Sequence, residues 1–256
     1  MSAQKPLASI ITVCFNAAAS IGQTLDSVRA QSWRPLESVV VDGASRDGTQ
    51  DIVARYADIT GTVVSEKDSG IYDAMNKGIA LARGDVLHFL NAADCFADAG
   101  VVEAALREFA ADPDLDLVFG DAIYLTPDGP FLRSYGRVTA SNLIYGDLCH
   151  QAVFAHRRLF ERFGGFNLDY RINADYDWML RVFRGGARVR YLPRPIVRYD
   201  TGGQSARNQA QTFAERDRVR QTHVAPLRLA AGMKLYRLQR KLRTLAGSPE
   251  LSPLDR

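Results

Sequence analysis

The sequence has few cysteines and no long apolar run, and these absences exclude several kinds of protein. Its 256 residues include three cysteines, Cys14, Cys95 and Cys149, which are far apart and form no Cys-x-x-Cys pair. A disulfide framework or a zinc site is therefore not expected, and a reducing compartment is favoured. No run of 18 apolar residues is present, which excludes a membrane span, and the apolar run at the start is too short for a signal peptide.

Charge of one sign is also missing, because 32 Lys or Arg residues are set against 29 Asp or Glu residues. The resulting net charge of +3 gives no strong field, so nucleic acid is not expected as a partner. Hydrophobic residues make up 46% of the chain, which is ample for one large domain or two fused halves. We expect a cytoplasmic, globular protein.

The first half of the chain alternates apolar runs rich in β-branched residues with segments of helical spacing. Val39, Val40 and Val41 form a run suited to a strand that is buried on both faces. Strands that alternate with helices predict an α/β fold with a mostly parallel sheet flanked by helices. The expected strands and helices are, in order, 8–13, 17–31, 37–41, 50–56, 61–65, 70–83 and 86–90.

The second half is less regular and contains more glycine and proline. We expect helices at 101–111, 157–163 and 175–183, a strand at 115–124, loops over 125–150, and short strands at 189–192 and 196–199 around two prolines. This pattern divides a domain at 1–215 into a first half, about 1–95, and a second half, about 96–215. The remaining residues, 216–256, are expected to form a basic helical extension.

The extension contains a segment, residues 226–245, with six Lys or Arg residues and no acid. Leu235, Leu238, Leu242 and Leu245 follow at 3-4-3 spacing, which puts them on one helical face. A helix with one apolar and one basic face suits an anionic membrane surface. The alternatives are a helix packed on its own domain and a frayed basic end.

The most informative stretch is residues 65–94, where a polar turn, a helix and a buried strand lead to Asp94. In α/β sheets, ligands bind beyond the carboxyl ends of the strands. Asp94 follows the expected strand at 86–90, so it is a candidate to face a diphosphate, directly or through a divalent metal. The alternative is an ordinary turn residue.

Several motifs follow one another in a fixed order: Asn16 after the first strand, VVVDGAS, GIYDAMNKGIALARGD, HQAVF, GGFN and NADYDW. Together they resemble family 2 glycosyltransferases over about residues 7–205. The resemblance implies a GT-A fold, which is Rossmann-like, and an inverting enzyme that uses a nucleotide-diphosphate sugar. Residues 65–94 and 149–178 are most similar to the bacterial subgroup that builds cell-envelope polysaccharides and glycolipids.

The resemblance also implies which residues bind the donor. Asp42 would contact the base, commonly uracil, and a turn aspartate is its alternative. Asn16 is otherwise a helix cap, and Asn76 is otherwise a packing residue that fixes its helix against a loop. The implied nucleotide-sugar residues are Thr12, Cys14, Asn16, Asp42, Asp68, Asn76, Ala93 and Asp94.

A divalent metal, Mg²⁺ or Mn²⁺, is implied at Asp94. The family's Asp-x-Asp motif reads Asn91-Ala92-Ala93-Asp94 here, so most of its carboxylates are missing. Because Mg²⁺ often takes one or two carboxylates together with phosphates and water, a single Asp is sufficient in principle. Asp200 or the loop at 201–205 would add a metal ligand or close over the donor. The alternative is an ordinary loop that takes no part in binding.

Asp175, in Asn173-Ala174-Asp175-Tyr176-Asp177-Trp178, matches the family's catalytic base. A base is needed because the attacking hydroxyl must lose its proton as the new bond forms. The alternative is an acid that complements the helix dipole. His150 and Gln151 are expected on the acceptor side, with a structural histidine as the alternative. Trp178 would stack on the acceptor sugar or pack in the core.

These features predict an inverting glycosyltransferase at the inner face of a membrane. It would move a sugar, from a UDP-sugar in preference, to a hydroxyl of a glycolipid or polysaccharide precursor. The alternative is a non-catalytic module that binds nucleotide sugars. A dinucleotide oxidoreductase is disfavoured, because the turn after the first strand reads CFNAAAS and lacks the Gly-x-Gly-x-x-Gly fingerprint.

Overall fold

The computed structural model describes residues 5–202 and 208–245. The strands are β1 (Ala8–Cys14), β2 (Leu36–Asp42), β3 (Thr60–Ser65), β4 (Val86–Phe89), β5 (Cys95–Phe96), β6 (Leu117–Thr126), β7 (Gly129–Arg133), β8 (Val153–His156) and β9 (Val189–Asp200). The helices are α1 (Ile21–Arg29), α2 (Thr49–Val53), α3 (Ile71–Leu81), α4 (Val101–Ala111), α5 (Arg158–Phe163), α6 (Ala174–Arg184), α8 (Gln209–His223) and α9 (Pro226–Leu245), with short 3-10 turns at η1 (Ala54–Tyr56) and η2 (His150–Ala152).

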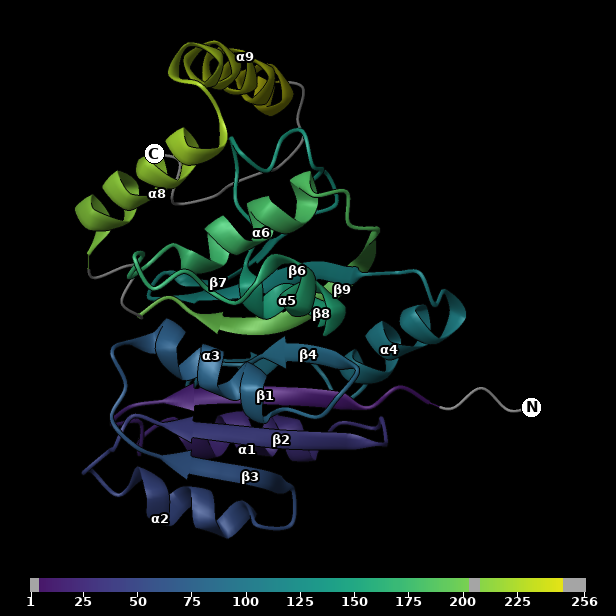
Figure 1. Ribbon diagram of the computed structural model, residues 1–256, viewed down its shortest axis with the longest axis vertical. Helices are drawn as coiled ribbons and strands as arrows, with labels where there is room; N and C mark the ends of the chain where they lie inside the picture. The colour runs from purple at the N-terminus through teal and green to yellow at the C-terminus, as the bar shows by residue number, and fades with distance from the viewer. Residues whose placement is uncertain (1–4, 203–207, 246–256) are drawn as a thin grey trace.

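All strands join one sheet in the order β3-β2-β1-β4-β8-β6-β9-β5, with β7 paired to β6. The first four are parallel, and β8 runs antiparallel to both β4 and β6. Figure 1 shows β3 and α2 at one end of the long axis and α9 at the other, with α3, α5 and α6 in front of the sheet. The mixed α/β sheet flanked by helices confirms the expected fold class.

The core lies on both faces of the sheet, because Val39, Val40 and Val41 are all buried, as the apolar run predicted. Helix α3 packs so closely on β1 that a Cβ on Gly78 would lie 2.4 Å from Cγ2 of Ile11. Glycine is required there because any side chain would push the helix off the strand. The helix that leads toward the site is therefore fixed against the sheet.

The second half differs from expectation in several places, and the strand β8 was not predicted. The region 125–150, expected as loops, contains β7, and the two short strands expected around the prolines are one strand, β9. Pro195 is accommodated where the register between β6 and β9 shifts, opposite Asp121. A register shift leaves a strand residue without a ladder hydrogen bond, so a proline costs little there.

Helix α8 was not predicted, and the domain boundary expected at 215/216 falls inside it. Glu215 and Val219 of this helix are buried, so α8 packs on the domain rather than extending from it. The basic helix predicted at 226–245 is confirmed as α9. The expected loop residues at 203–205 and the end of the extension, 246–256, lie outside the described residues.

Candidate functional site

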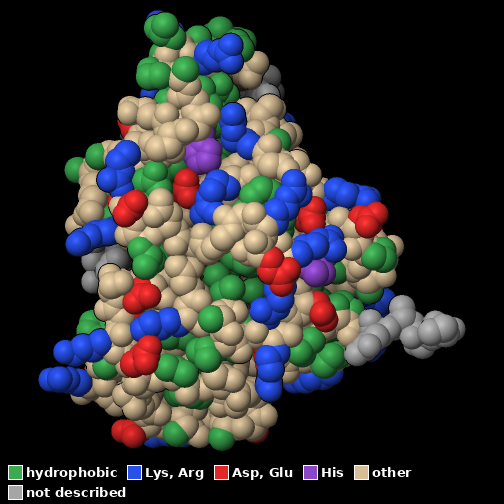
Figure 2. Space-filling model, in the orientation of Figure 1, with side chains coloured by type: hydrophobic (Ala, Val, Ile, Leu, Met, Phe, Trp, Pro, Cys, Tyr) green, Lys and Arg blue, Asp and Glu red, His purple; other side chains and the backbone are tan. Residues whose placement is uncertain are grey.

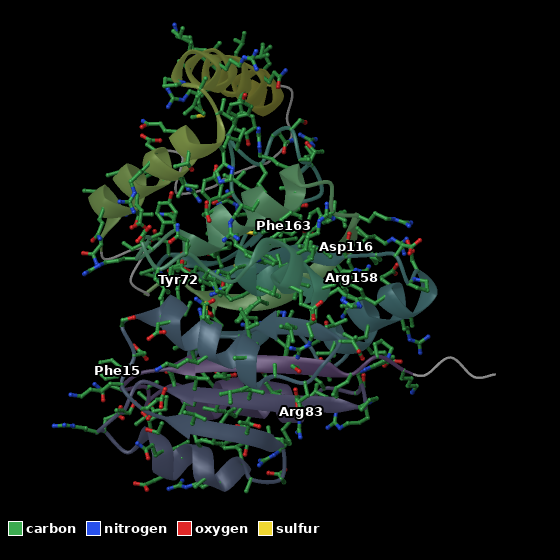
Figure 3. All side chains as sticks on the ribbon, in the orientation of Figure 1. Phe15, Tyr72, Arg83, Asp116, Arg158 and Phe163 are labelled. Atoms are coloured by element: carbon green, nitrogen blue, oxygen red, sulfur yellow. The ribbon has the colours of Figure 1, made fainter. Side chains whose placement is uncertain are left out.

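The candidate site lies where the parallel strands β1, β2 and β4 end. Cys14 ends β1 and is paired with Asp42 at the end of β2, while Asp94 follows β4 after a short turn. Figure 3 shows Phe15 and Tyr72 on the side of the molecule at which β1 ends, with Arg83 toward the opposite side. Cys14, Asp42 and Asp94, three of the residues predicted to bind the donor, therefore share one edge of the sheet.

Asp42 is 1% exposed, and its carboxylate accepts hydrogen bonds from its own surroundings. Oδ2 accepts from the Ser45 N–H at 3.0 Å, the Gln50 amide at 3.2 Å and the Ser65 hydroxyl at 2.6 Å. Oδ1 accepts from the Ser45 hydroxyl and from the Cys14 thiol at 3.7 Å. These are the contacts of a turn residue, so a contact between Asp42 and a nucleobase stays a prediction.

Thr12 and Cys14 lie below the surface of this edge. Thr12 is fully buried, and its hydroxyl has no hydrogen-bond partner among the described residues. Cys14 is 7% exposed, and burial, with the nearby Asp42 carboxylate, raises the pKa of its thiol well above the usual range. Both side chains are buried beneath this edge of the sheet, and their contact with a nucleoside stays a prediction.

Asn16 does not cap a helix, because α1 begins at Ile21 with Ser20 in the capping position. It has a positive φ of 48° and holds the turn that follows β2. Its N–H donates to the Ser45 hydroxyl at 2.7 Å, and its Oδ1 accepts from the Arg46 N–H at 3.1 Å. Asn16 thus ties the ends of β1 and β2 together.

Phe15 was missed by the sequence reasoning. Its ring is 65% exposed, although it directly follows β1 and lies beside Gly43 and Asp68. A Cβ on Gly43 would lie 2.7 Å from Oδ2 of Asp68 and 3.2 Å from Cδ2 of Phe15, so the three residues converge. Asp68 also accepts from the Gly70 N–H at 3.0 Å. The signal was present in the sequence as an aromatic residue between Cys14 and Asn16.

Asn76 makes the contacts of the packing alternative. Its amide donates to Phe166 O at 2.9 Å and accepts from Phe166 N–H at 2.8 Å. Both ends of the amide are therefore used to fix α3 against the loop that carries Gly165, and donor binding by Asn76 is untested.

Asp94 is 3% exposed and lies at the centre of the candidate site. Its Oδ2 accepts from the Gln151 amide at 2.8 Å and its Oδ1 from the Asp200 N–H at 2.9 Å. Burial raises the pKa of this carboxyl from 3.8 to about 7, although both hydrogen bonds oppose the rise. Ala93 before it has a positive φ of 86°, so the turn holds Asp94 inward.

The donors at Asp94 fit a divalent metal only in part. Each carboxylate oxygen keeps one lone pair beyond its hydrogen bond, and Asn91 nearby has a buried Oδ1 with no partner among the described residues. Within residues 5–202 and 208–245, no group of three or more His, Cys, Asp or Glu side chains could hold a metal. An ion here would take most of its ligands from a diphosphate and water. Asp200 supplies its N–H to Asp94, while its carboxylate accepts from Gly202 at 2.6 Å.

Asp175 lies at the start of α6 and is held by three donors from different parts of the chain. Oδ2 accepts from Nδ1 of His150 at 2.7 Å, and Oδ1 lies 2.8 Å from both the Tyr72 hydroxyl and the Tyr176 N–H. Burial raises the pKa of this carboxyl, but the hydrogen bond and charge of His150 and the Tyr72 hydroxyl outweigh it, and the pKa lies below 3.8. Tyr72 was not predicted as a site residue, although it stands in the family-like segment.

The adjacent residues His150 and Gln151 connect the two carboxylates. Gln151 contacts Asp94, while His150 contacts Asp175, and both belong to η2. The side chains of His150 and Asp175 are 16% and 17% exposed, so both remain accessible from the solvent side. Nε2 of His150 lies 3.3 Å from the Asn91 amide nitrogen. Asp94 and Asp175, far apart in sequence, therefore flank a single turn.

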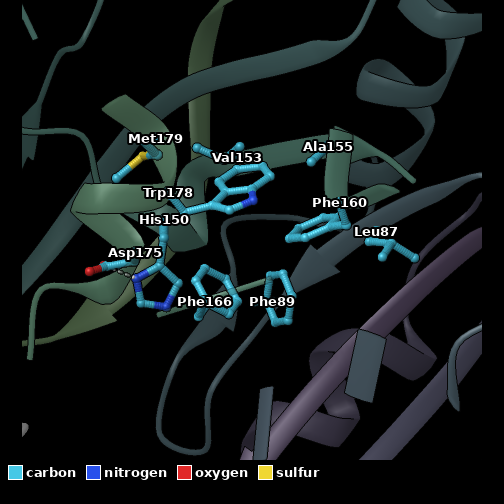
Figure 4. A pocket seen from close by; sticks show the side chains of 10 residues that line it. All are labelled: Leu87, Phe89, His150, Val153, Ala155, Phe160, Phe166, Asp175, Trp178 and Met179. Atoms are coloured by element: carbon cyan, nitrogen blue, oxygen red, sulfur yellow. Dashed lines mark hydrogen bonds and ion pairs between the residues drawn. The ribbon is translucent and has the colours of Figure 1, made fainter. Parts of the chain in front are cut away.

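Trp178 adopts the core-packing alternative rather than an exposed stacking position. Its ring is 3% exposed, lies 4.4 Å from the Phe160 ring, and donates its N–H to Gly164 O at 3.1 Å. Figure 4 shows it above and to the right of the paired His150 and Asp175, among the apolar residues that line the same pocket. Trp178 therefore offers no open face to an acceptor sugar in this conformation.

Two solved structures have a similar arrangement of elements. TarS from S. aureus, in complex with UDP-GlcNAc, matches with a TM-score of 0.67 and 19% identity over 77% of this chain and 59% of the TarS chain. The mannosyltransferase PcManGT from Pyrobaculum calidifontis, in complex with GDP-Man and Mn²⁺, matches with a TM-score of 0.62 and 23% identity over 84% of this chain and 65% of that chain. The fold is thus that of the GT-A glycosyltransferases.

The sequence comparisons narrow this class to one family. Residues 9–184 match the model of Glycosyl transferase family 2, so the chain belongs to this family and is a glycosyltransferase. A PGL/p-HBAD biosynthesis glycosyltransferase from Mycobacterium bovis is 36% identical over 203 residues, which is 77% of this chain and 78% of that protein. A putative teichuronic acid biosynthesis glycosyltransferase, TuaG from Bacillus subtilis, is 39% identical over 97 residues, 37% of this chain and 38% of its own length.

Proposed function

We propose that the enzyme transfers a sugar with inversion and uses Asp175 as the general base. The observation that carries this proposal is the turn at His150 and Gln151, which contacts Asp175 on one side and Asp94 on the other. A displacement with inversion needs a base on one face of the sugar and a stabilised leaving group on the opposite face. The positions of Asp175 and Asp94 on either side of one turn support such an arrangement.

In the proposed reaction, the acceptor oxygen forms a bond to the anomeric carbon while the bond from that carbon to the diphosphate oxygen breaks. The electron pair of the broken bond leaves with the diphosphate, and the hydroxyl proton passes to Asp175. His150 and Tyr72 hold the carboxylate in its ionised form until the proton arrives. Asp94 would hold a Mg²⁺ or Mn²⁺ ion together with the donor diphosphate, and such an ion neutralises charge on the leaving group.

We propose a nucleotide-diphosphate sugar as the donor, with UDP-sugars favoured. The structurally similar TarS was solved with UDP-GlcNAc and PcManGT with GDP-Man. The exposed ring of Phe15 offers a stacking face for a base beside the carboxylate of Asp68. A base that stacks there would direct its polar edge toward this carboxylate and its diphosphate along the strand ends toward Asp94.

The proposed acceptor is a hydroxyl of a cell-envelope glycolipid or polysaccharide precursor. The similar mycobacterial protein is named for PGL/p-HBAD biosynthesis, and TuaG for teichuronic acid biosynthesis. Such acceptors are held at a membrane, so we place the enzyme on the cytoplasmic face of the inner membrane. No helix among residues 5–202 and 208–245 is long and apolar enough to cross a bilayer.

Helix α9 is the proposed contact with that membrane. Leu227 is 88% exposed, and Leu235, Leu238 and Leu242 are each more than half exposed, whereas the side chain of Leu245 lies outside the described residues. Figure 2 shows hydrophobic and Lys or Arg side chains together at the end of the molecule that α9 forms. An apolar row flanked by basic residues and no acid suits anionic lipid.

Vesicle sedimentation tests the membrane contact. The protein should sediment with vesicles that contain anionic lipid and remain in solution with neutral vesicles. Replacing Leu235, Leu238 and Leu242 by Ser should abolish this, whereas replacing the exposed Leu132 and Leu168 by Ser should have no effect. If the variant with three serines in α9 sedimented as fully as the control variant at Leu132 and Leu168, a role for α9 would be contradicted.

The transfer mechanism is tested in two steps with Asp175→Asn. A panel of nucleotide sugars, with and without Mg²⁺ or Mn²⁺, identifies the donor by thermal stabilisation, since a ligand that binds the native state raises the melting temperature. Transfer is then measured with a glycolipid acceptor. Asp175→Asn should lower kcat by about 10²–10⁴-fold with unchanged donor stabilisation, while the exposed Asp169→Asn should behave as wild type. Near-normal transfer by Asp175→Asn would refute the base, and donor binding without any transfer by the wild type would support the non-catalytic alternative.

A further inference from the structure

Helix α8 lies outside the part of the chain that matches the family model, which ends at residue 184. It nevertheless contributes a nearly buried carboxylate, Glu215, to the loop directly before the proposed base. Figure 1 shows α8 next to α6 and between that helix and α9.

The Glu215 carboxylate accepts hydrogen bonds from three consecutive backbone N–H groups. Oε1 accepts from Arg171 at 2.8 Å, and Oε2 accepts from both Ile172 and Asn173 at 2.7 Å. Asn173 is the residue that caps α6. The first N–H groups of a helix have no partner within the helix, and a carboxylate near them is stabilised by the helix dipole. Glu215, which belongs to α8, thus accepts hydrogen bonds from the N–H of the residue that caps α6 and from the two N–H groups before it.

The same loop is held from its opposite side by Tyr72. Its hydroxyl lies 2.6 Å from Ile172 O and 2.8 Å from Oδ1 of Asp175. The single hydroxyl proton of Tyr72 is shared between these two acceptors, so Tyr72 links the Ile172 carbonyl to Asp175, while Glu215 holds the Ile172 N–H. Since Asp175 is only three residues further on, in the first turn of α6, the position of its carboxylate depends on this loop.

Other contacts keep α8 in place along the same part of the molecule. The Asn173 amide donates to Thr212 O at 3.0 Å, and Nε2 of His223 lies 3.0 Å from Oδ1 of Asp177. Arg216 lies over the Tyr176 ring, 4.8 Å from its centre. The helix therefore contacts residues immediately before and after Asp175 in sequence.

We propose that Glu215 is a positioning residue for Asp175, which rests on the proposed role of Asp175 as the base. The two oxygens of the Glu215 carboxylate accept from all three backbone N–H groups, so this side chain holds the loop in one arrangement. A glutamine at this position has one carbonyl oxygen and turns an NH₂ group toward at least one backbone N–H. The loop and the first turn of α6 then move, and the base loses its alignment with the acceptor hydroxyl.

The test is the kinetics of Glu215→Gln. We expect kcat to fall by about 10- to 100-fold, because a misplacement of about 1 Å costs up to this much, while donor affinity stays within twofold. Glu215→Asp keeps the charge with a shorter reach, and it should lose less activity. Asp217→Asn is the matched control, since its side chain is 62% exposed on the same helix and pairs only locally with Arg220; it should match the wild type.

A double mutant separates positioning from general destabilisation. If Glu215 acts through Asp175, adding Glu215→Gln to Asp175→Asn should cause no further loss of kcat, because the two residues act as a unit. Fully additive losses would overturn the proposal, and so would wild-type kcat in Glu215→Gln. If Glu215→Gln does not fold, Glu215→Asp in the same double-mutant test decides, with a non-additive loss supporting the proposal and an additive loss or none overturning it.

The two proposals fail in different ways. Normal transfer by Asp175→Asn would remove the proposed base and the role of Glu215 with it. Loss of transfer in Asp175→Asn together with wild-type behaviour of Glu215→Gln would leave the base in place and overturn only the positioning role.

Discussion

The turn at His150 and Gln151 lies between two carboxylates with opposite pKa shifts. After the roles proposed above, the side with Asp94 is called the donor side and the side with Asp175 the base side. On the donor side, burial raises the pKa of Asp94 to about 7. On the base side, burial also raises the pKa of Asp175, but the hydrogen bond and charge of His150 and the Tyr72 hydroxyl bring it below 3.8. The partners differ, because His150 forms a hydrogen bond to Asp175, whereas Asp94 accepts hydrogen bonds from an amide and a backbone N–H and is influenced by His150 only through its charge.

This contrast shows which side is complete without a ligand. Asp175 has an imidazole, a hydroxyl and a backbone N–H around it, so its negative charge is stabilised by the protein itself. At Asp94 the hydrogen bonds and the charge of His150 do not outweigh burial, and a cation brought with the donor would add positive charge there. The base side is preorganised, whereas the donor side is expected to be completed by its ligand.

The largest expected effect that can break this comparison comes from Asp94→Asn. If Asp94 holds the cation, the variant should lose the extra thermal stabilisation that Mg²⁺ or Mn²⁺ adds to donor binding. Its kcat should fall by about 10²–10³-fold, the usual cost of removing one electrostatic stabiliser of a transition state. Asp175→Asn should retain the metal effect in the same assay.

Asp114→Asn serves as the control, because that side chain is 81% exposed and remote from the turn. An unchanged response of Asp94→Asn to the metal would show that the donor side does not depend on Asp94.

A smaller effect is expected at Phe15, which sharpens the comparison by separating binding from chemistry. Stacking of a base on an aromatic ring contributes about 1–3 kcal/mol, so Phe15→Ala should weaken donor binding by roughly 5- to 150-fold. At saturating donor, kcat should remain that of the wild type, since the Phe15 ring is proposed to contact the base of the donor and not the reacting atoms. Calorimetry and initial rates measure the two quantities.

Phe213→Ala provides the control, since that ring is 45% exposed but belongs to α8. A fall in kcat with unchanged donor affinity would show that Phe15 acts on the chemical step and does not bind the donor base.

The donor side could be predicted largely from the sequence because its residues follow strands. A carboxylate after a buried parallel strand lies at the carboxyl edge of the sheet, which brought Asp42 and Asp94 to the same edge from spacing alone. The sequence did not reveal that Asp94 would be turned inward, since this depends on Gln151 and on the backbone of Asp200. The positive φ of Ala93 is equally invisible in the residue pattern.

The base side could be predicted only through family resemblance. Tyr72, His150, Asp175 and Glu215 come from four separate parts of the chain, and local spacing contains no information about contacts between them. Helix α8 was missed for a related reason, because its apolar residues are few and its attachment depends on Glu215 and its arginines. The sequence could not decide whether Trp178 packs in the core or stacks on the acceptor sugar, because an aromatic residue on a helix suits both roles; in the structure it is buried.

The smallest expected effect is on the pH dependence of stability, and it comes from His88 in β4, the strand that leads to Asp94. His88 has a low pKa because of burial. His88 in β4 is fully buried between the rings of Phe154 and Phe96, at 4.3 and 4.9 Å, with no carboxylate beside it. Burial therefore lowers the pKa of this imidazole from 6.5 to about 3, opposed in part by a hydrogen bond to Val153 O.

Because the unfolded chain binds a proton at His88 below pH 6.5 and the folded chain does not until about pH 3, stability is present above 6.5 and is lost as the pH falls. The loss is about 1.4 kcal/mol per pH unit, or about 2 kcal/mol at pH 5. Urea unfolding of His88→Gln should show a free energy of unfolding that declines by about that much less between pH 7 and pH 5. The half-buried His156→Gln should change the decline less, and equal declines in His88→Gln and wild type would show that a buried imidazole without a carboxylate does not govern the acid sensitivity of this side.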